Sequence, residues 1–539
     1  MIRSGLASQL AVLILVTGAL VVTTSAQDPA PATSGTSGTS GTSGSGAPGS
    51  GFPEDAPLAK SDDEQLWSLT LPDCRQMALQ DSFTLKQAEL QPRIEAANRT
   101  VAEAQFDWIL TANTKYARQK DMSLSSALVG GSIVNFSNNL HVEQWQNSVG
   151  LSRYFDTGTT ASVTWFYNKN ERRLGSLSVR DSTGFQLAVS QNLLKSFGPH
   201  ANNYALETAA ITEKIKESLV TQARQDLLFN VEQAFWNLVF AHEDLKVTAK
   251  ATALARKDQD IAQRKRQAGL ATDIDVVDAD KRLKDKEGEL YERRKTVRDA
   301  SDALLALIAP QRLLELARGQ NRLIIVPDDY QTTEADTVQG VDVQSLVQKA
   351  LTWREELRQA SLSQETSRLA VENAQNQGMP ELTFSAAFNF GGQDQNTGRA
   401  FESFARTDQT DWYLQLAFSV PLGQKEASGS MEKARQQQKS AEYDKRLAEV
   451  KVITDVLGAI RELETAQLAQ STKQTAELLA RRQVEAAEER LRRGLATRFE
   501  VDTFKSARDV AQRDTLQSWV RLRIAGAALR KATGTLGRE

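Results

Sequence analysis

The chain contains two copies of one unit, placed about 225 residues apart. Residues 263–309 align with residues 488–534 without a gap, and both segments carry Gly-Leu-Ala-Thr, at 269–272 and 494–497. Upstream, the segment 187–190 recurs as 416–419. A repeat of this length constrains the fold strongly, because each copy must build the same set of elements.

Each copy predicts a first helix, then strands, a long helix and a return helix. These helices span 71–105, 201–267 and 274–309 in copy one, and 341–377, 427–493 and 499–533 in copy two. Good helix formers dominate the long helices, and Pro is absent from them. A helix of about 67 residues is roughly 100 Å long, which equals the first and return helices placed end to end. The lengths therefore predict two antiparallel columns per copy, with the Gly-Leu-Ala-Thr turn at one end.

Two segments of copy two alternate strictly between apolar and polar residues. One face carries Leu382, Phe384, Phe388 and Phe390 in the first segment, and Trp412, Leu414, Leu416 and Phe418 in the second. This alternation is typical of transmembrane β-barrel strands, although an antiparallel sheet on a soluble core shows it too. The long helices and an export signal favour the barrel. Since one chain has too few strands to close, we expect the barrel to be shared between protomers.

Copy one contains an additional pair of strand-like runs between its first strand and its long helix. The runs are 148–155 and 160–167, and only Asp156-Thr157-Gly158-Thr159 separates them, which favours a hairpin. Stretches rich in Ser, Asn and Gly flank the pair and predict long outer loops. We therefore expect six strands per protomer, four from copy one and two from copy two. Arg153 falls on the otherwise apolar face of the first run, so pairing of this hairpin above the membrane is the alternative, and the total strand count of the barrel stays open.

The N-terminal segment predicts export from the cytoplasm. Residues 1–26 have a basic start at Arg3, an apolar run and a small-residue cleavage site, as a signal peptide does. Residues 27–64 are a flexible linker rich in Thr, Ser, Gly and Pro. The remaining organisation is repeat one at 65–320, a connector at 321–340 and repeat two at 341–539.

The composition offers little chemistry. The 65 Lys and Arg nearly balance the 68 Asp and Glu, which argues against a nucleic-acid partner. The histidines at 141, 200 and 242 lack metal-ligand spacing, and no phosphate loop or nucleophile elbow is present. We therefore expect no enzyme activity, no metal and no cofactor. The one cysteine, Cys74, excludes an intramolecular disulfide and is expected to be a small buried residue.

These patterns together resemble the TolC family of outer-membrane efflux proteins over about residues 65–539. The motifs that carry the resemblance are the two-copy plan, the arginines before each Gly-Leu-Ala-Thr, the segment 234–238 (Ala-Phe-Trp-Asn-Leu), the segment 353–357 (Trp-Arg-Glu-Glu-Leu) and Pro380. The resemblance implies an α+β fold of long α-helices in an α-barrel, with a transmembrane antiparallel β-barrel shared by a homotrimer. It also implies four strands per protomer, two fewer than the alternation predicts.

The resemblance further implies where partners bind. A periplasmic adaptor would dock at Gly269, Leu270, Ala271 and Thr272, and at Gly494, Leu495, Ala496 and Thr497. Acidic rings would narrow the periplasmic entrance at Glu500 and at Thr503, where this sequence lacks the acid, with Asp502 nearby. For Glu500, the alternative is a charge that favours a helix N-terminus, and Asp273 and Asp275 are expected to act in that way.

The expected function is that of an exit duct in the outer membrane of a Gram-negative bacterium. It would conduct cargo passively in a tripartite efflux or type I secretion system, with energy supplied by an inner-membrane pump of the RND, ABC or another class. The alternative is a periplasmic coiled-coil adaptor or scaffold that never enters lipid, which explains the helices but not the two-faced strands.

Overall fold

The computed structural model describes residues 64–174, 176–316, 318, 322–330 and 342–538. The predicted signal peptide and nearly all of the predicted linker lie outside these residues, so both stay predictions. Every described residue belongs to one compact unit.

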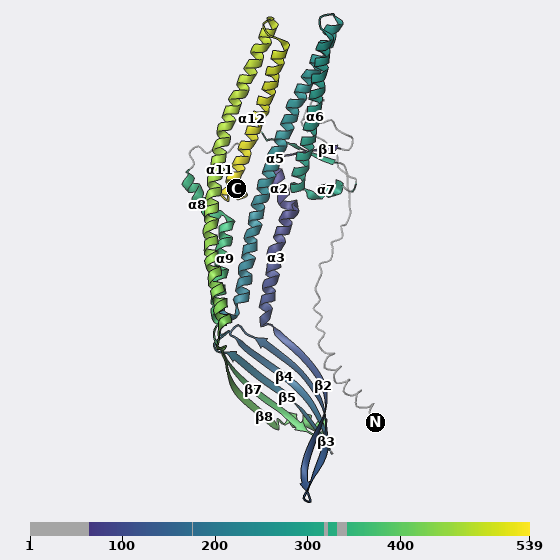
Figure 1. Cartoon of the computed structure of the whole chain (residues 1–539), viewed down its shortest axis with the longest axis vertical. Helices are drawn as coiled ribbons and strands as arrows, with labels where there is room; N and C mark the ends of the chain where they lie inside the picture. The colour runs from purple at the N-terminus through teal and green to yellow at the C-terminus, as the bar shows by residue number, and fades with distance from the viewer. Residues whose placement is uncertain (1–63, 175, 317, 319–321, 331–341, 539) are drawn as a thin grey trace, which may run out of the picture. The chain divides into compact units, whose positions relative to one another are not determined.

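The predicted order of helices is confirmed in both copies (Figure 1). Copy one contains α2 (Leu71–Asp81), α3 (Phe83–Glu103), α5 (Tyr204–Gln267) and α6 (Asp273–Ile308). Copy two contains α8 (Val343–Trp353), α9 (Glu355–Gln377), α11 (Lys425–Arg492) and α12 (Arg498–Ala532). Short helices η1 (Ala104–Phe106), α4 (Pro199–Asn202), α7 (Pro310–Leu316) and α10 (Thr397–Ala405) lie in the connections.

The first helix of each copy is broken once, so the prediction of single helices over 71–105 and 341–377 was wrong. The breaks fall at Ser82 and Arg354, whose ψ angles of 125° and 124° are extended. Both residues are buried, and Arg354 donates hydrogen bonds to the carbonyl oxygens of Lys531 and Ala532. The break at Arg354 is thus held by bonds to α12, and no Gly or Pro marks either break in the sequence.

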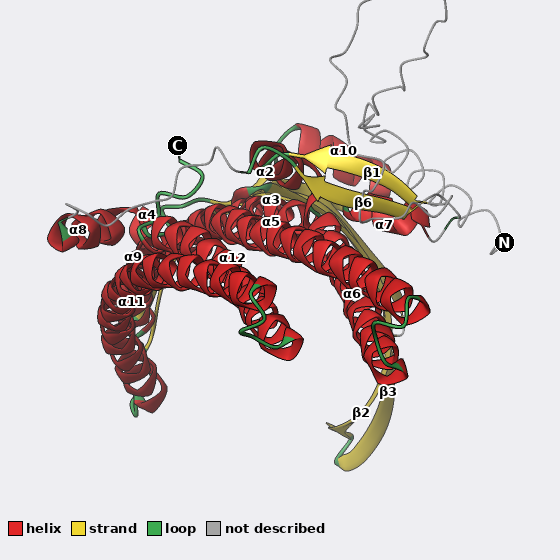
Figure 2. Ribbon diagram, turned by 90° about the horizontal axis from the view of Figure 1, so that it is seen from above, coloured by secondary structure: helices red, strands yellow, loops and turns green. Residues whose placement is uncertain are grey.

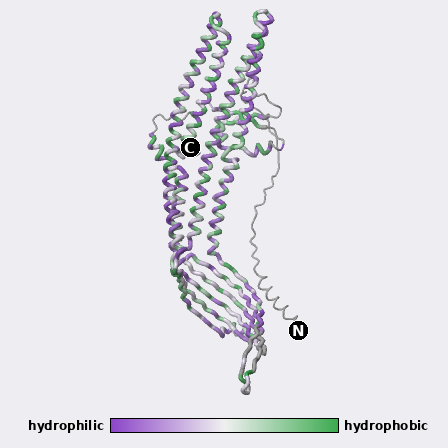
Figure 3. The backbone as a smooth tube through the Cα atoms, in the orientation of Figure 1, coloured by the Kyte–Doolittle hydropathy of each residue, from purple (hydrophilic) through white to green (hydrophobic). Residues whose placement is uncertain are grey.

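The long helices lie side by side in four columns. Near the sheet the order is α3, α5, α9 and α11, and near the tips it is α6, α5, α12 and α11. Viewed end-on, these helices follow an arc (Figure 2). Hydrophobic and hydrophilic segments interleave along them (Figure 3), as expected of helices that bury a stripe rather than a whole surface.

The main hydrophobic core lies midway along the helices, where α2, α5 and α6 meet a two-stranded parallel sheet. That sheet pairs β1 (Glu64–Leu69) with β6 (Arg322–Pro327). Phe235 and Leu238 of α5 are fully buried there, and Trp236 nearly so. Cys74 is also fully buried in this core, as predicted.

The other sheet has six antiparallel strands in the order β2-β3-β4-β5-β7-β8. Copy one contributes β2 (Trp108–Val129), β3 (Ser132–Tyr154), β4 (Thr159–Leu174) and β5 (Ser176–Asn192), and copy two contributes β7 (Glu381–Asp394) and β8 (Gln409–Ser419). The additional hairpin, β3–β4, and the count of six strands are thus confirmed.

The predicted long outer loops beside this hairpin are absent from the described residues, because the strands continue through them. β2 and β3 stay paired up to the partners Val129 and Ser132. Gly130 and Gly131 join them with φ angles of 61° and 85°, which suit a tight two-residue hairpin turn. Ser and Asn are poor strand formers, so composition suggested a loop where a continuous cross-strand ladder holds the chain extended.

Candidate functional site

The tip of copy one joins α5 to α6 through a turn that requires a glycine. Gly269 has a φ of 69°; its N–H donates to the Arg266 carbonyl at 2.9 Å, and the Leu270 N–H donates to the Lys265 carbonyl at 2.7 Å. This pair of bonds is the Schellman motif, which ends a helix with a left-handed residue. A Cβ on Gly269 would meet no atom within 4 Å, so the backbone angle alone favours glycine here.

The tip of copy two repeats this geometry between α11 and α12. Gly494 has a φ of 73°; its N–H donates to the Leu491 carbonyl at 3.0 Å, and the Leu495 N–H donates to the Arg490 carbonyl at 2.8 Å. Each return helix then starts at the threonine of Gly-Leu-Ala-Thr. The threonine side chains accept from the backbone N–H three residues later, at 3.3 Å from Asp275 and 3.2 Å from Glu500.

Both tips expose large apolar side chains. Leu270 is 78% and Leu495 67% exposed, and Ile274 and Phe499 on the first turns of the return helices are 72% and 81% exposed. Exposed apolar side chains clustered at corresponding places of two hairpins are typical of a protein-binding surface. Leu270 and Leu495 belong to the predicted docking segments, whereas sequence reasoning missed Ile274 and Phe499 as exposed residues.

Asp275 and Glu500, the acids that follow the two turns, have different hydrogen-bond partners. Asp275 completes a capping box, because its carboxylate accepts from the Thr272 backbone N–H at 2.8 Å. The hydroxyl and N–H of Thr272 lower the pKa of Asp275. The Glu500 carboxylate instead accepts from Arg490 at 3.0 Å. The predicted capping role therefore holds for Asp275, while Glu500 is tied to the last turn of α11.

Asp502 and Thr503 do not line up with Glu500 as a single acidic cluster. Asp502 forms an ion pair with Arg282, so it connects the return helices of the two copies. Thr503 is exposed and its hydroxyl donates to the Phe499 carbonyl at 2.9 Å.

The six-stranded sheet has one continuous apolar face. Directly paired residues share a face of a sheet, and one such row crosses all six strands. It consists of Leu110, Leu151, Val163, Leu187, Phe388 and Trp412. Every predicted lipid-facing residue lies on this face: Leu382, Phe384, Phe388 and Phe390 on β7, and Trp412, Leu414, Leu416 and Phe418 on β8. On β8 the exposed fraction of these side chains is 63% or more.

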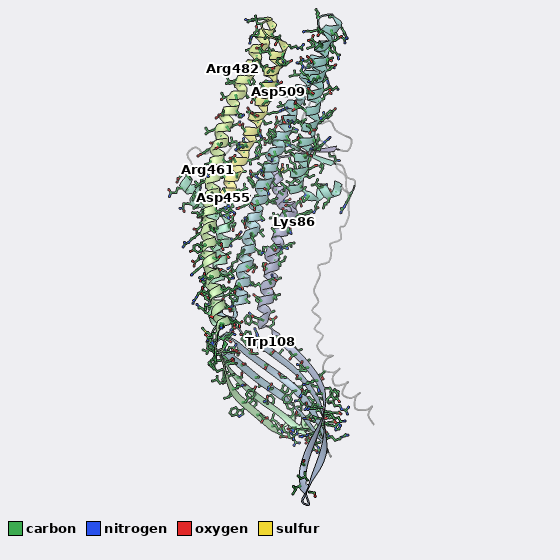
Figure 4. The ribbon with its side chains drawn as sticks, in the orientation of Figure 1. Lys86, Trp108, Asp455, Arg461, Arg482 and Asp509 are labelled. Carbon is green, nitrogen blue, oxygen red and sulfur yellow. The ribbon has the colours of Figure 1, made fainter. Side chains whose placement is uncertain are left out.

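Polar and aromatic residues bound this apolar face at both ends. At the end next to the helices, Arg153 donates to the Phe106 carbonyl at 2.8 Å and stacks on the ring of Trp108, which Figure 4 labels at the junction with the sheet. At the far end, Tyr116 and Trp145 lie with ring centroids 4.6 Å apart. Aromatic and basic residues at both limits are typical of strands that cross a bilayer.

The sequence model of the outer membrane efflux protein family matches residues 158–309 and 346–535, together more than half of the chain. The chain belongs to this family. No functionally curated protein matches its sequence. The predicted resemblance and the predicted fold class, with two structural repeats, are confirmed.

The fold of this chain is similar to those of solved outer membrane channels. The Campylobacter jejuni CmeC channel superposes with a TM-score of 0.63 at 15% identity, covering 86% of this chain and 85% of that one. VceC from Vibrio cholerae gives 0.59 at 18% identity, covering 86% and 96%. The open state of Neisseria gonorrhoeae MtrE gives 0.58 at 15% identity, covering 87% and 90%.

This efflux protein also holds a buried carboxylate whose ion pairs join its two copies. Glu232 of α5 is fully buried and bonds Arg75 of copy one at 2.6 Å and Arg530 of copy two at 3.0 Å. In the sequence, its sign is an acid among the mostly apolar residues of 227–238. A buried carboxylate needs such partners, so these bonds fix how the copies pack.

The same mid-helix region contains groups with shifted pKa values. Burial, helped by the nearby Lys246 ammonium and opposed by Glu243, lowers the pKa of His242 to about 4. Burial raises the pKa of the Cys74 thiol to about 12, which leaves it uncharged and unreactive. None of the helices in the described part of the chain combines the length and the apolar character that crossing a bilayer requires.

Proposed function

We infer that this chain is one protomer of a homotrimeric exit duct in the outer membrane of a Gram-negative bacterium. The duct would passively conduct cargo delivered by a periplasmic adaptor and an inner-membrane pump of the RND, ABC or another class. The observation that carries this proposal is the strand register. It gathers apolar side chains from six strands onto one face, with aromatic and charged residues at its limits.

The edges of the sheet support an oligomer. β2 and β8 are the outer strands, and each has a neighbour on one side only. Unpaired backbone groups are very costly in lipid, so the β2 edge of one copy must pair with the β8 edge of the next. A head-to-tail contact of this kind closes into a ring when the rotation fits.

The helices at the same two edges carry matching apolar stripes. On α3, Phe83, Leu90, Ile94 and Val101 are 43–72% exposed. On α11 the exposed stripe is formed by Tyr443, Leu447, Val450 and Leu457. Spacings of three, four and seven residues are those of helices that pack along their length. Ring closure would bury both stripes against each other.

The tips are the proposed adaptor sites. Leu270 and Leu495 with their exposed neighbours Ile274 and Phe499 offer two similar apolar knobs per protomer. An adaptor hairpin that packs against both would gain several tens of square ångströms of apolar burial at each, at about 25 cal/mol per Å². Glu500 of copy two, repeated in three protomers, is proposed to line the entrance and attract cations. Thr503 adds no charge to that ring.

Cell fractionation tests the proposal against the periplasmic scaffold. A trimeric duct needs detergent for extraction and runs as a trimer in mild detergent, whereas a scaffold is released by osmotic shock. Release by osmotic shock, or a monodisperse monomer with native circular dichroism in mild detergent, overturns the proposal.

A further inference from the structure

We propose that the sheet forms a wide, untapered exit with a mainly polar lining, built for hydrophilic cargo up to about 20 Å across. This inference rests on the proposed trimeric duct and assigns it a cargo class. It follows from four features: the width of the sheet, the extent of its apolar face, the lining of its opposite face and the position of α10 (Thr397–Ala405).

The width of the sheet matches the width of the helices above it. Four helix columns at about 9 Å spacing span about 36 Å per protomer. Six strands at about 4.8 Å, tilted by about 40°, span about 38 Å, whereas four strands would span only about 25 Å. The additional hairpin β3–β4 therefore lets the barrel continue the helical tunnel without narrowing. Three copies would give eighteen strands and a backbone diameter of about 36 Å, in the range that leaves an aqueous channel.

The additional hairpin belongs to the membrane-spanning part rather than to an outer loop. Leu151 of β3 and Val163 of β4 lie in the same apolar row as Leu187 and Phe388. Arg153, the one charge on this part of the face, lies at the end next to the helices, where it bonds the backbone of η1. An arginine is tolerated at that boundary, so it does not exclude the hairpin from lipid.

The opposite face of the sheet is mainly polar. Its residues at the level of the apolar row include Thr164, Gln186, Ser190, Ser385 and Asn389. Among the described residues at this level, β3, β4, β5 and β7 place no charged side chain on the inner face, whereas β8 places Asp411 there, paired with Asn389. Hydroxyl and amide groups hydrate well, so the lining suits hydrophilic cargo, while Asp411, repeated in three protomers, would favour cations over anions.

The helix between β7 and β8 leaves this inner face open. A Cβ on Gly392 would lie 2.0 Å from the Phe404 nitrogen, so α10 packs directly on the side of β7 that Gly392 faces. That side is the apolar one, because Gly392 and Phe390 are two residues apart. Phe404 lies 5.7 Å from Phe185, and Phe401 lies 6.0 Å from Tyr167. α10 is therefore placed outside the barrel, along the convex side of the arc in Figure 2.

Labelling in intact cells with membrane-impermeant maleimide polymers of graded size tests the proposal. Ser190→Cys places a thiol on the inner face next to the helices, and Gln186→Cys is a second position in case the first variant folds poorly. The native Cys74 is fully buried with its pKa raised to about 12, so it gives no background. We expect both inner thiols to react with polymers up to about 20 Å across.

Two matched variants separate the outcomes. Ser132→Cys at the far hairpin should react with every polymer, and Leu187→Cys on the apolar face with none. Reaction of the inner thiols with only the smallest maleimide, while Ser132→Cys reacts fully, overturns the wide exit but leaves the duct standing. Reaction at Leu187→Cys overturns the assignment of faces. An unreactive Ser132→Cys in intact cells overturns the proposed function, and the wide exit with it.

Discussion

The two long helices, α5 and α11, come from equivalent parts of the repeat but have different surroundings. α5 has 64 residues and lies between helices on both sides, whereas α11 has 68 residues and lies at the edge, against α8, α9 and α12. Trp236 of α5 is nearly buried and contacts Trp519 of α12, with ring centroids 5.3 Å apart. The equivalent residue of α11 is Arg461, which is exposed.

The two copies thus share a backbone fold, but whether an equivalent side chain is buried depends on where its helix lies in the arc. Leu238 and its equivalent Leu463 are both fully buried, because both face the helices of their own copy. The equivalent residues that differ in burial are those that face the neighbouring column of the arc. In one chain, copy two packs beside α5. In the proposed trimer, copy one of the next chain would pack beside α11 in the same way, so this side of α11 is uncovered in a single chain.

Disrupting the proposed contact between α11 and the next protomer should have the largest effect, which is on trimer formation. Leu447 is 65% exposed in the middle of the α11 stripe. Leu447→Arg would place a charge between two packed helices, and an unpaired buried charge costs several kcal/mol. We expect loss of the trimer, measured by light scattering in mild detergent. Glu442→Arg, at an exposed position beside the stripe, is the matched control. A stable Leu447→Arg trimer would contradict the proposed interface.

Most of the helical arrangement was predictable, since length, composition and the repeat all point to the same columns. The break at Arg354 was not, because it depends on bonds to distant residues such as Ala532, and the break at Ser82 carries no Gly or Pro that would mark it. Alternation placed Phe388 and Trp412 on one face. Alternation alone did not give the register between neighbouring strands, because the register depends on which residues pair across each strand.

The helix tips allow a second comparison of the copies, with a smaller expected effect. Leu495→Asp would place a charge where an adaptor's apolar surface is expected to dock, and should reduce export tenfold or more, since about 1.4 kcal/mol corresponds to tenfold. Leu270→Asp should act similarly if both hairpins dock. Leu495→Met is the control, because it keeps volume and apolar character. Export is measured in cells with trimer content verified. Unaltered export in both Asp variants would remove the tips from the docking surface.

The candidate site was less predictable than the fold. The Gly-Leu-Ala-Thr segments could be located, because identical turns in two copies are visible in the sequence. The capping role of Asp275 was predictable, but the partner of Glu500 at the equivalent position was not. Asp275 reaches back to Thr272, whereas the longer Glu500 side chain reaches Arg490. The length of the side chain and the presence of Arg490 therefore determine whether the acid caps its own helix or bonds to α11.

Glu500 and Asp275 therefore make a matched pair for ion selectivity. We expect Glu500→Lys to lower the cation preference severalfold in single-channel recordings, because a ring of cations would replace a ring of anions at the entrance. Asp275→Lys should weaken the cap of α6 but leave selectivity unchanged. Equal changes in both variants would mean that the general charge of the tips, rather than a ring at Glu500, sets the preference.

The last comparison concerns the pH dependence of stability, which should differ between the cores of the two copies. His242 of α5 corresponds to Gln467 of α11, so only copy one carries a titratable group there. Its pKa is lowered to about 4, whereas an unfolded histidine titrates near 6.5. Between these values the unfolded chain binds more protons, so stability is fully present above about pH 6.5 and falls as the pH drops toward 4. We expect about 2 kcal/mol to be lost by pH 5. His242→Gln, which copies the residue of repeat two, should flatten this part of the profile. The readout is the denaturation midpoint of the detergent-solubilised protein between pH 7 and 4.5, and a variant whose midpoint still falls as steeply as the wild type would place the acid sensitivity elsewhere.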